Sequence, residues 1–205
     1  MKRCVIIAGA EITNYNYIKT ILNDNDFYIF CDSGLMHKDK LSIVPDLIVG
    51  DFDSCANPNL NIETIVLPCE KDDTDAMFAV KTAIQRGFDD FLLLGVVGGR
   101  FDHSLVNISI LTHLYEMGKT AKIIDDYSEM EFVKNTTIIE DVFSYFSLIA
   151  IGGDVEGITI KNAKYTLQDG TITMGYQYGI SNEVLKGEKS YVSLKKGLLL
   201  LIKVW

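Results

Sequence analysis

The sequence predicts an α/β N-terminal domain with a mostly parallel sheet, followed by a C-terminal all-β sandwich. In residues 1–124, short apolar runs alternate with segments of helical periodicity, which is typical of strand–helix units repeated around a parallel sheet. From residue 125 on, the helical period disappears, and short strand-like runs are separated by Gly, Asn and Asp. We therefore predict two domains, residues 1–124 and 125–205, which follow each other without a Pro- or Ser-rich linker.

Six apolar runs in residues 1–124 are expected to form strands. The first is uninterrupted by polar residues, as in a strand that is covered on both faces. The six runs are RCVIIAG, FYIFCDSG, DLIVGDFDS, ETIVLP, FLLLGVVGGR and TAKIID. Their alternation with helical segments indicates a sheet that carries helices on its faces.

Three helices are expected between these strands. Residues 15–22 form a short one, a second begins near Thr74 and ends at Gly87, and a third begins near Asp102 and ends at Gly118. Spacings of three and four mark one face of each longer helix. These faces carry Met77, Val80 and Ile84 in the second helix, and Leu105, Ile108, Thr112 and Tyr115 in the third.

Seven short runs after residue 125 are expected to be the strands of the sandwich. They are bounded by turn-forming residues and have no helical period. The runs are MEFVKN, TTIIED, YFSLIAI, GITIKNAKYTL, TITMGYQYGIS, YVSLKKG and GLLLLIKVW.

Composition and charge restrict the compartment and the partners. No apolar run is long enough to span a bilayer, and Gly9 and Glu11 end the first apolar run too early for a secretory signal, so we expect a cytoplasmic protein without a membrane partner. The net charge of −9 argues against a nucleic acid partner, because phosphate backbones require clusters of Lys and Arg. A nucleotide that arrives with its own magnesium, or a cationic small substrate, remains compatible with this charge.

The cysteines and histidines do not indicate a disulfide framework or a zinc site. Cys4, Cys31, Cys55 and Cys69 are widely spaced without a C-x-x-C motif, and buried reduced thiols are expected. The three histidines are scattered along the chain, which argues against zinc.

Carboxylates follow four strands in succession. Asp32 follows the second predicted strand, and Asp51 and Asp53 follow the third; Asp72, Asp73 and Asp75 follow the fourth, and Asp102 follows the fifth. Ligands of open parallel sheets bind outside the carboxyl ends of the strands, so these acids are expected to meet at one edge. Two unit charges roughly 5 Å apart repel by about 3 kcal/mol at an effective dielectric near 20. A cation among them, with Mg²⁺ favoured by carboxylate oxygens, would remove this repulsion.

Each of these acids also has a purely structural explanation. Asp32 can belong to a turn, and Asp53, Asp75 or Asp102 can cap a helix or lie in its first turn. Their joint placement at consecutive strand ends favours a metal–phosphate site over four unrelated caps.

The stretch GVVGGRFDH adds a group of residues suited to an anion. Gly98 and Gly99 allow the backbone to approach an anion closely, and Arg100 can bind phosphate oxygens with its forked guanidinium. The alternative is an ordinary glycine turn between a strand and a helix. The stretch is neither a Walker loop nor a G-x-G-x-x-G motif.

Several blocks of the sequence resemble the signature blocks of the thiamine pyrophosphokinase family. The resembling stretches cover nearly the whole chain in order: CDSG, PDLIVGDFDS, KDDTD, GVVGGRFDHSLVN, GYQYGISNEV and VSLKKGLLLLI. The resemblance implies an N-terminal α/β domain that binds Mg·ATP, a C-terminal β-sandwich, and a homodimer with thiamine bound where the subunits meet. The implied reaction converts ATP and thiamine to AMP and thiamine diphosphate.

The resemblance also implies roles for individual residues. Metal ligands would be Asp51, Asp53 and Asp75, which hold Mg²⁺, with Mn²⁺ as a possible substitute. The nucleotide would contact Asp32, Lys71, Asp72, Gly98, Gly99 and Arg100. Asp75, Arg100 and Asp102 would be the catalytic residues, and Asp102, Ser181 and Asn182 would contact thiamine. Some members have a tryptophan near thiamine; the only tryptophan here, Trp205, lies outside these blocks, and Tyr176 or Tyr178 is a substitute.

Three other functions are compatible with parts of the pattern. The same phosphate site could serve another alcohol, such as a hydroxymethylpterin, and only the region of Ser181 would distinguish that substrate. A sugar-nucleotide transferase could use the pair Asp51-x-Asp53, but it needs no second domain with a Ser-Asn-Glu block. A non-catalytic nucleotide sensor would not need acids after four strands.

Overall fold

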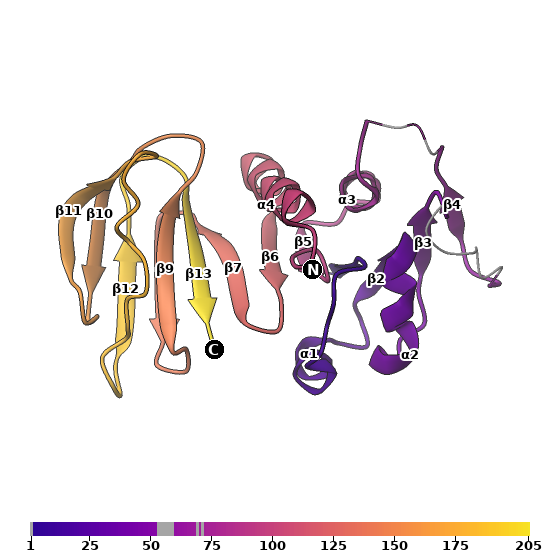
Figure 1. The fold of residues 1–205 in the computed structure, drawn as a ribbon, viewed down its shortest axis with the longest axis horizontal. Coiled ribbons are helices and arrows are strands. Elements are labelled where there is room, and N and C mark those ends of the chain that lie inside the picture. The colour runs from indigo at the N-terminus through magenta and orange to yellow at the C-terminus, as the bar shows by residue number, and fades with distance from the viewer. Residues whose placement is uncertain (1, 53–59, 69, 71) are drawn as a thin grey trace. The chain divides into compact units, whose positions relative to one another are not determined.

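The computed structural model describes residues 2–52, 60–68, 70 and 72–205. It divides the chain into two compact units, Met1–Asp126 and Tyr127–Trp205, and each is described by itself (Figure 1). No helix among the described residues is long and apolar enough to cross a bilayer.

The described residues of the N-terminal unit form six parallel strands in the order β4-β3-β2-β1-β5-β6. Their bounds are β1 Arg3–Ile7, β2 Phe27–Cys31, β3 Leu47–Gly50, β4 Thr64–Val66, β5 Asp90–Leu94 and β6 Thr120–Ile124. Four consecutive residues of β1, β2, β3 and β5 are buried, as the continuous apolar runs predicted.

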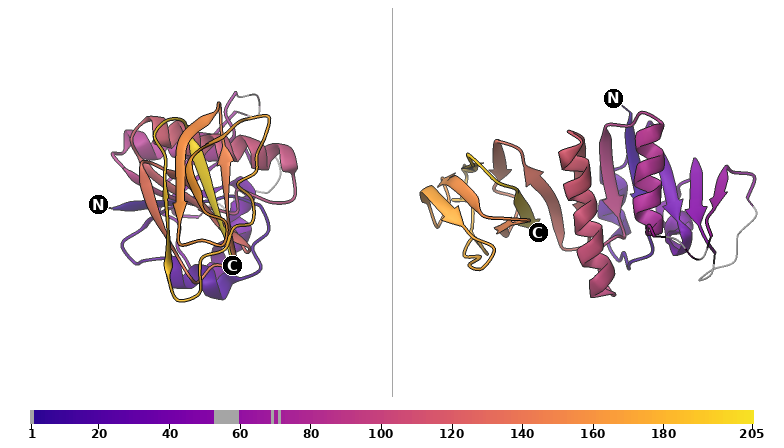
Figure 2. Two further views of the ribbon diagram at one scale, coloured as in Figure 1. Left: turned by 90° about the vertical axis from the view of Figure 1, so that its left-hand side faces the viewer. Right: turned by 90° about the horizontal axis from the view of Figure 1, so that it is seen from above.

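The chain order of this sheet creates a point where its direction reverses. From β1 the chain adds β2, β3 and β4 on one side, and it then returns to place β5 and β6 on the other side. Right-handed crossovers therefore place the helices before and after the reversal on opposite faces. Figure 1 shows α1 and α2 on one face of the sheet and α3 and α4 on the other, and α3 and α4 lie side by side in Figure 2.

Five helical segments lie between these strands in the part of the chain that the structure describes. Their bounds are α1 Tyr15–Ile21, the 3₁₀ helix η1 Asp32–His37, α2 Lys38–Leu41, α3 Asp75–Gln85 and α4 Phe101–Glu116. The three helices expected from the sequence are present. Segments η1 and α2 were not expected, because ten residues without a clear apolar period give no helical signal.

The buried face of α4 differs from the predicted one. Leu105 is 54% exposed, and the buried residues are Ser104, Asn107, Ile110, Leu111 and Leu114. A search for apolar residues at helical spacing could not find this face, because its first two buried residues are polar. In α3, Val80 is buried as expected, and alanines fill most of the remaining buried positions.

The C-terminal unit consists of two antiparallel layers. One has the order β7-β13-β9 and the other β11-β10-β12-β8. Bounds are β7 Ser128–Val133, β8 Thr136–Glu140, β9 Tyr145–Ala150, β10 Val155–Lys161, β11 Leu167–Ile172, β12 Lys189–Ser193 and β13 Leu199–Val204. Apolar residues from all seven strands form one buried core, which confirms the predicted sandwich.

One strand of this unit lies earlier in the chain than expected. The sequence predicted a strand in the run TITMGYQYGIS. In the structure β11 ends at Ile172, and most of that run forms the connection to β12. Gln177 explains part of this difference, since its side-chain amide exchanges two hydrogen bonds of 3.0 Å with the backbone of Ala150 at the end of β9. A side chain thereby substitutes for a backbone partner, which sequence alternation cannot reveal.

Two of the four cysteines can be assessed. Cys4 and Cys31 are buried free thiols, and burial raises the pKa of both well above the usual value. These two therefore agree with the expectation of inert reduced thiols, whereas Cys55 and Cys69 lie outside the described residues.

Candidate active site

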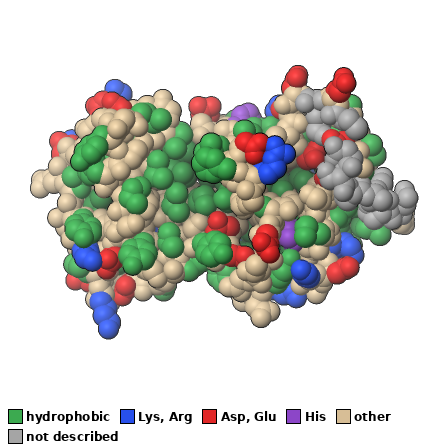
Figure 3. Space-filling model, in the orientation of Figure 1, with side chains coloured by type: hydrophobic (Ala, Val, Ile, Leu, Met, Phe, Trp, Pro, Cys, Tyr) green, Lys and Arg blue, Asp and Glu red, His purple; other side chains and the backbone are tan. Residues whose placement is uncertain are grey.

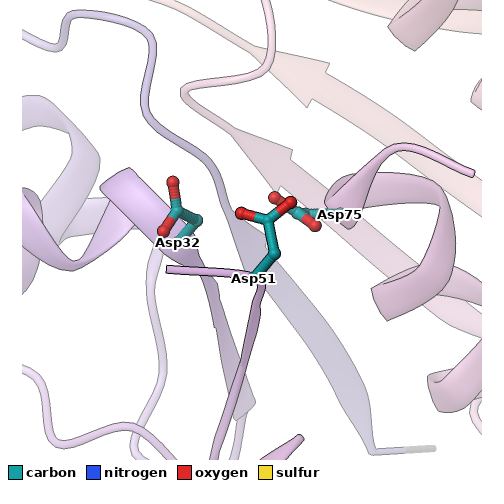
Figure 4. Close-up of side chains that lie close together, drawn as sticks. All are labelled: Asp32, Asp51 and Asp75. Carbon is teal, nitrogen blue, oxygen red and sulfur yellow. The ribbon is translucent and has the colours of Figure 1, made fainter. Parts of the chain in front are cut away.

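Three carboxylates meet at the carboxyl edge of the N-terminal sheet. One oxygen from each of Asp32, Asp51 and Asp75 lies within 4.8 Å of the other two. Figure 4 shows the three side chains converging from different elements: Asp32 begins η1, Asp51 follows β3, and Asp75 begins α3. Asp32 is buried, and the other two are half-buried.

Backbone features at two strand ends allow this close approach. Asp32 has a left-handed backbone with φ of 37°, which a non-glycine residue adopts at a cost. A Cβ atom at Gly50 would lie 3.0 Å from the Cβ of Asp32 and 3.2 Å from its backbone nitrogen. Glycine at position 50 therefore lets the end of β3 bring Asp51 beside Asp32.

A second glycine fixes the position of η1 against β1. A Cβ atom at Gly34 would lie 2.2 Å from the backbone oxygen of Ile7, closer than any packed structure permits. The sequences DSG and VGD thus each pair one aspartate with the glycine that makes its placement possible.

Asp75 is positioned by the start of α3. The side chain of Thr74 accepts a hydrogen bond of 3.2 Å from the backbone nitrogen of Met77, which makes Thr74 the N-cap. Asp75 is then the first helical residue, where the helix dipole favours a negative charge. This dipole explains one acid at this point, but it does not explain why two more acids face it.

The donor set of this cluster fits a hard divalent cation. Carboxylate oxygens from three separate elements approach to distances that a single ion can bridge, and Mg²⁺ prefers such ligands together with phosphate oxygens and water. Without a cation, charges at about this separation repel by roughly 3 kcal/mol per pair at an effective dielectric near 20. The residues present therefore fit a metal ion.

A cavity of about 350 Å³ opens beside the acids within the N-terminal unit. Its lining comes from the ends of β1, β2 and β3, from the first turn of α3 and from the first two turns of α4. The lining residues are Ala8, Gly9, Cys31, Asp32, Ser33, Asp51, Thr74, Asp75, Ala76, Arg100, His103 and Asn107. This volume is within the range of small-molecule sites.

The glycine stretch after β5 has the backbone that its sequence predicted. Gly98 and Gly99 have φ angles of 125° and 57°, and no backbone or other side-chain atom within 3.4 Å crowds the space beside either one. The hydroxyl of Ser104 accepts a hydrogen bond of 3.0 Å from the nitrogen of Gly98 and donates one of 3.1 Å to the oxygen of Arg100. The stretch is therefore held to the first turn of α4, with its glycines open to an approaching group.

Arg100 and Asp102 form an exposed ion pair. The two N–O distances are 3.2 Å and 2.5 Å, and the side chains are 71% and 64% exposed. The guanidinium of Arg100 lowers the pKa of Asp102 to about 2. Asp102 is consequently ionised at neutral pH and, while paired, is a poor acceptor for a proton.

The other residues predicted for the nucleotide are distributed differently. Asp72 is exposed and is not among the residues that line the cavity. Asp53 and Lys71 lie outside the described residues. The cavity instead includes His103 and Asn107, to which no role was given, although both stand in GVVGGRFDHSLVN at helical spacings from Arg100 that could have placed them on one face.

In the C-terminal unit, Asn182 is occupied by the protein itself. Its side-chain oxygen accepts hydrogen bonds from the backbone nitrogens of Tyr165 (3.0 Å) and Glu183 (2.9 Å). Its side-chain nitrogen donates to the backbone oxygen of Tyr165 at 2.7 Å, and the residue is 5% exposed. The amide thus holds two loops together and has little hydrogen-bonding capacity left.

Ser181, the neighbour of Asn182, is presented differently. Its backbone is left-handed with φ of 56°, and its backbone nitrogen donates to the hydroxyl of Ser147 at 3.1 Å. It is exposed, so its hydroxyl is accessible. Nearby, a cavity of about 130 Å³ in this unit is lined in part by Tyr165, Tyr178 and Asn182.

Comparison with known protein families yields two matches that together span most of the chain. The model of the thiamin pyrophosphokinase catalytic domain matches residues 18–124, and the model of the thiamin pyrophosphokinase vitamin B1 binding domain matches residues 135–199.

Individual proteins match over nearly the full length. A Bacillus subtilis protein named thiamine pyrophosphokinase is 29% identical, with 99% of each chain covered. The crystal structure of thiamine pyrophosphokinase from Bacillus subtilis has 27% identity, a TM-score of 0.85 and 99% coverage of both chains. That from Geobacillus thermodenitrificans has 24% identity and a TM-score of 0.82, with 99% and 97% of the chains covered, and it supports the fold.

Proposed function

The chain belongs to the thiamine pyrophosphokinase family, and we propose that it transfers the pyrophosphoryl group of ATP to the hydroxyl of thiamine, with release of AMP. It is therefore an ATP-using transferase with a thiamine-binding domain. The observation that carries the proposed chemistry is the convergence of Asp32, Asp51 and Asp75 on a cavity that Arg100 also lines.

Mg²⁺ is the cation proposed for this cluster, and Mn²⁺ can substitute. Asp32, Asp51 and Asp75 would hold it, with Asp53 as a further ligand predicted from the family motif. Bound there, the ion would neutralise phosphate charge and screen the acids from each other. Asp32 was assigned to the nucleotide from the sequence, and its place among the other two acids supports adding it to the ligand set.

Arg100 and the glycines beside it are proposed to position the triphosphate. The guanidinium can bind two phosphate oxygens at once, and the open backbone of Gly98 and Gly99 allows close approach. Lys71 and Asp72 remain predicted contacts of the triphosphate. In-line attack on the β-phosphorus needs alignment of the reacting atoms to within a fraction of an ångström, so positioning is the main contribution of these groups.

Movement of Arg100 would change the chemistry of Asp102. In the structure the two side chains form an ion pair with each other. Once Arg100 turns to the phosphates, Asp102 loses the partner that lowers its pKa and becomes a better acceptor for the hydroxyl proton of thiamine. Its negative charge also attracts the cationic thiazolium ring.

The C-terminal unit is proposed to contribute to thiamine binding and to dimerisation. Ser181 contacts thiamine, while Asn182 holds the segment on which Ser181 lies. Exposed aromatic and aliphatic residues of this unit support a homodimer interface and include Tyr145, Tyr165, Tyr176, Tyr178 and Ile180. Figure 3 shows hydrophobic side chains, in green, on one face of this unit. A cytoplasmic location stays a prediction.

The decisive experiment identifies the nucleotide product. The purified protein is incubated with ATP, thiamine and Mg²⁺, quenched early, and its nucleotides are resolved by ion exchange. AMP and thiamine diphosphate are expected in equal amounts. ADP as the first product would contradict pyrophosphoryl transfer, and turnover of a hydroxymethylpterin in place of thiamine would replace the substrate while keeping the mechanism.

Oligomeric state needs a separate measurement. Light scattering at micromolar concentration is expected to give the mass of two chains. A monomer that retains full activity would rule out the proposed homodimer.

A further inference from the structure

We propose that Asn107 is a substrate-contacting residue whose side-chain oxygen accepts a hydrogen bond from a hydroxyl group of a bound substrate. The inference rests on the proposed function and deepens it, since it concerns the same cavity. Neither the sequence motifs nor the family comparison gave this residue a role.

The orientation of the Asn107 amide is fixed by the protein. Its side-chain nitrogen donates a hydrogen bond of 2.6 Å to the backbone oxygen of Val96, just after β5. A carbonyl oxygen can only accept, so the nitrogen of the amide must face Val96 and the oxygen must face elsewhere.

The remaining oxygen is buried without a hydrogen-bond donor from the described part of the chain. Asn107 is only 6% exposed, its Oδ1 atom has no partner there, and the residue lines the cavity beside the acids. A buried amide oxygen without a donor is costly, and such atoms in native proteins are usually satisfied by a ligand or by ordered water.

The chemistry of the cavity restricts the donor. Phosphate and carboxylate oxygens accept hydrogen bonds at neutral pH, so neither a triphosphate nor the neighbouring aspartates can satisfy another acceptor. Adenine and the thiamine pyrimidine each carry an amino donor, but these rings lie away from the phosphates. Hydroxyl donors next to the phosphates occur in two places: the ribose of the nucleotide and the alcohol of thiamine. Either one would match a neutral acceptor, and its removal would leave the oxygen unpaired.

The position of Asn107 in the sheet supports a ligand contact. Val96 follows β5, and Ala8 and Gly9, which line the same cavity, follow β1. These two strands are neighbours at the point where the chain order of the sheet reverses, which is where open α/β sheets bind ligands. Asn107 lies two helical turns after Arg100, which is proposed to bind the triphosphate, and both residues line this cavity, so its oxygen lies where groups next to the phosphates are expected.

Ser104 offers a matched control for the structural role of Asn107 in holding the stretch after β5. Both side chains project from α4 and hold the stretch after β5, Ser104 through Gly98 and Asn107 through Val96. Only Asn107 lines the cavity. Substituting Ser104 therefore loosens the same stretch without removing an acceptor aimed at the substrate.

The test measures equilibrium binding by calorimetry in the presence of Mg²⁺. The wild type is titrated with ATP, 2′-deoxy-ATP, 3′-deoxy-ATP, thiamine, and a thiamine analogue in which hydrogen replaces the hydroxyl. The same titrations follow with Asn107→Ala and, as the control, Ser104→Ala. We expect one hydroxyl-deleted ligand to bind the wild type about 5–10-fold more weakly than its parent. The affinity of that deleted ligand should not fall further in Asn107→Ala.

The ligand that shows this pattern identifies the source of the hydroxyl. A deoxy-ATP would assign Asn107 to the ribose, and the thiamine analogue would assign it to the acceptor alcohol. On Ser104→Ala, the parent and deleted ligands should keep their wild-type ratio.

Two results would overturn the inference. One is equal binding of every parent and deleted ligand to the wild type, which would leave water or a ring amino group as the donor. This result does not depend on the folding of any variant. The other is a weakening of all ligands by a common factor on Asn107→Ala, as a purely structural residue would produce. A wild type that binds neither ATP nor thiamine would instead contradict the proposed function.

Discussion

The acid edge of the N-terminal unit and the segment around Asn182 in the C-terminal unit both hold residues that the sequence singled out, but their polar groups are used differently. At the acid edge, Asp32, Asp51 and Asp75 bring like charges together from three elements. At the C-terminal segment, the amide of Asn182 makes three hydrogen bonds to two neighbouring stretches of backbone.

This difference distinguishes residues with an expected role in ligand binding from residues with an expected structural role. Three like charges brought together from separate elements repel each other, and their arrangement suits a cationic ligand. Three of the four hydrogen bonds that the amide of Asn182 can make are used within the folded chain, so we expect its main contribution to be to stability and to the position of its neighbours. The two regions should therefore respond in opposite ways to substitution.

The largest expected effect is the loss of activity in Asp51→Asn. Removing one charge from the acid edge should lower turnover on the order of 10³-fold, comparable to losing a main electrostatic contact in other active sites. The melting temperature without ligand should be equal to or above that of the wild type, because repulsion is relieved. Steady-state kinetics and thermal unfolding in EDTA measure the two quantities.

Asp89→Asn is the matched control for this charge change. Asp89 pairs with Lys119 and lies just before β5, at the opposite edge of the sheet from the site. Its substitution should leave turnover within a factor of two. Full activity of Asp51→Asn, or wild-type activity in EDTA, would remove the metal from the proposal.

Asn182→Ala should show the opposite behaviour, with a large effect on stability. It removes three hydrogen bonds and leaves polar backbone groups of Tyr165 without a partner, at a cost of about 2–4 kcal/mol. Urea unfolding measures this loss. Glu183→Gln breaks only an exposed pair with Lys164 and should cost less than about 1 kcal/mol. Unchanged stability with weaker thiamine binding would instead make Asn182 a binding residue.

A third prediction concerns the pH dependence of the loop that lines the cavity. His37 is buried and contacts the backbone oxygen of Ala10 (3.0 Å) and the hydroxyl of Tyr15 (2.8 Å). Burial is the main cause of a lowered pKa, Lys40 lowers it further, and the bond to Ala10 and the charge of Asp126 oppose the shift. The folded protein therefore prefers the neutral ring.

The sign of the effect follows from this preference. The stability that His37 contributes is fully present above the ordinary pKa of 6.5 and is lost as the pH falls through the lowered pKa of the folded state. The wild type should melt at a lower temperature at pH 5.5 than at pH 7.5, and His37→Gln should reduce this difference. An identical pH dependence in the variant would contradict the prediction.

The smallest expected effect on stability belongs to Ser181→Gly. Glycine relieves the left-handed backbone at this position but gains freedom in the unfolded chain, and the two contributions, each about 1 kcal/mol, should nearly cancel. Loss of the hydroxyl should weaken thiamine binding about 5-fold, measured by calorimetry. Unaltered thiamine affinity would separate Ser181 from the site.

Much of the fold could be predicted because it depends on local patterns. Continuous apolar runs identified the strands of the parallel sheet, and glycines after helical periodicity identified the ends of α3 and α4. The buried face of α4 could not be predicted, because Ser104 and Asn107 are buried for their hydrogen bonds and not for apolar character. The position of β11 likewise depends in part on a side-chain contact of Gln177 with distant backbone.

The sequence by itself determined the chemistry of this protein: which strand ends carry acids, which glycines and arginine follow β5, and which family the ordered blocks resemble. The tertiary structure alone decided which of these groups meet. It placed Asp32 with Asp51 and Asp75, paired Arg100 with Asp102, and enclosed Asn107 beside the cavity. The physical reason is that residue type and spacing set local conformation, whereas the distance between side chains on separate strands depends on register, on left-handed backbone at Asp32, and on the missing Cβ atom of Gly50.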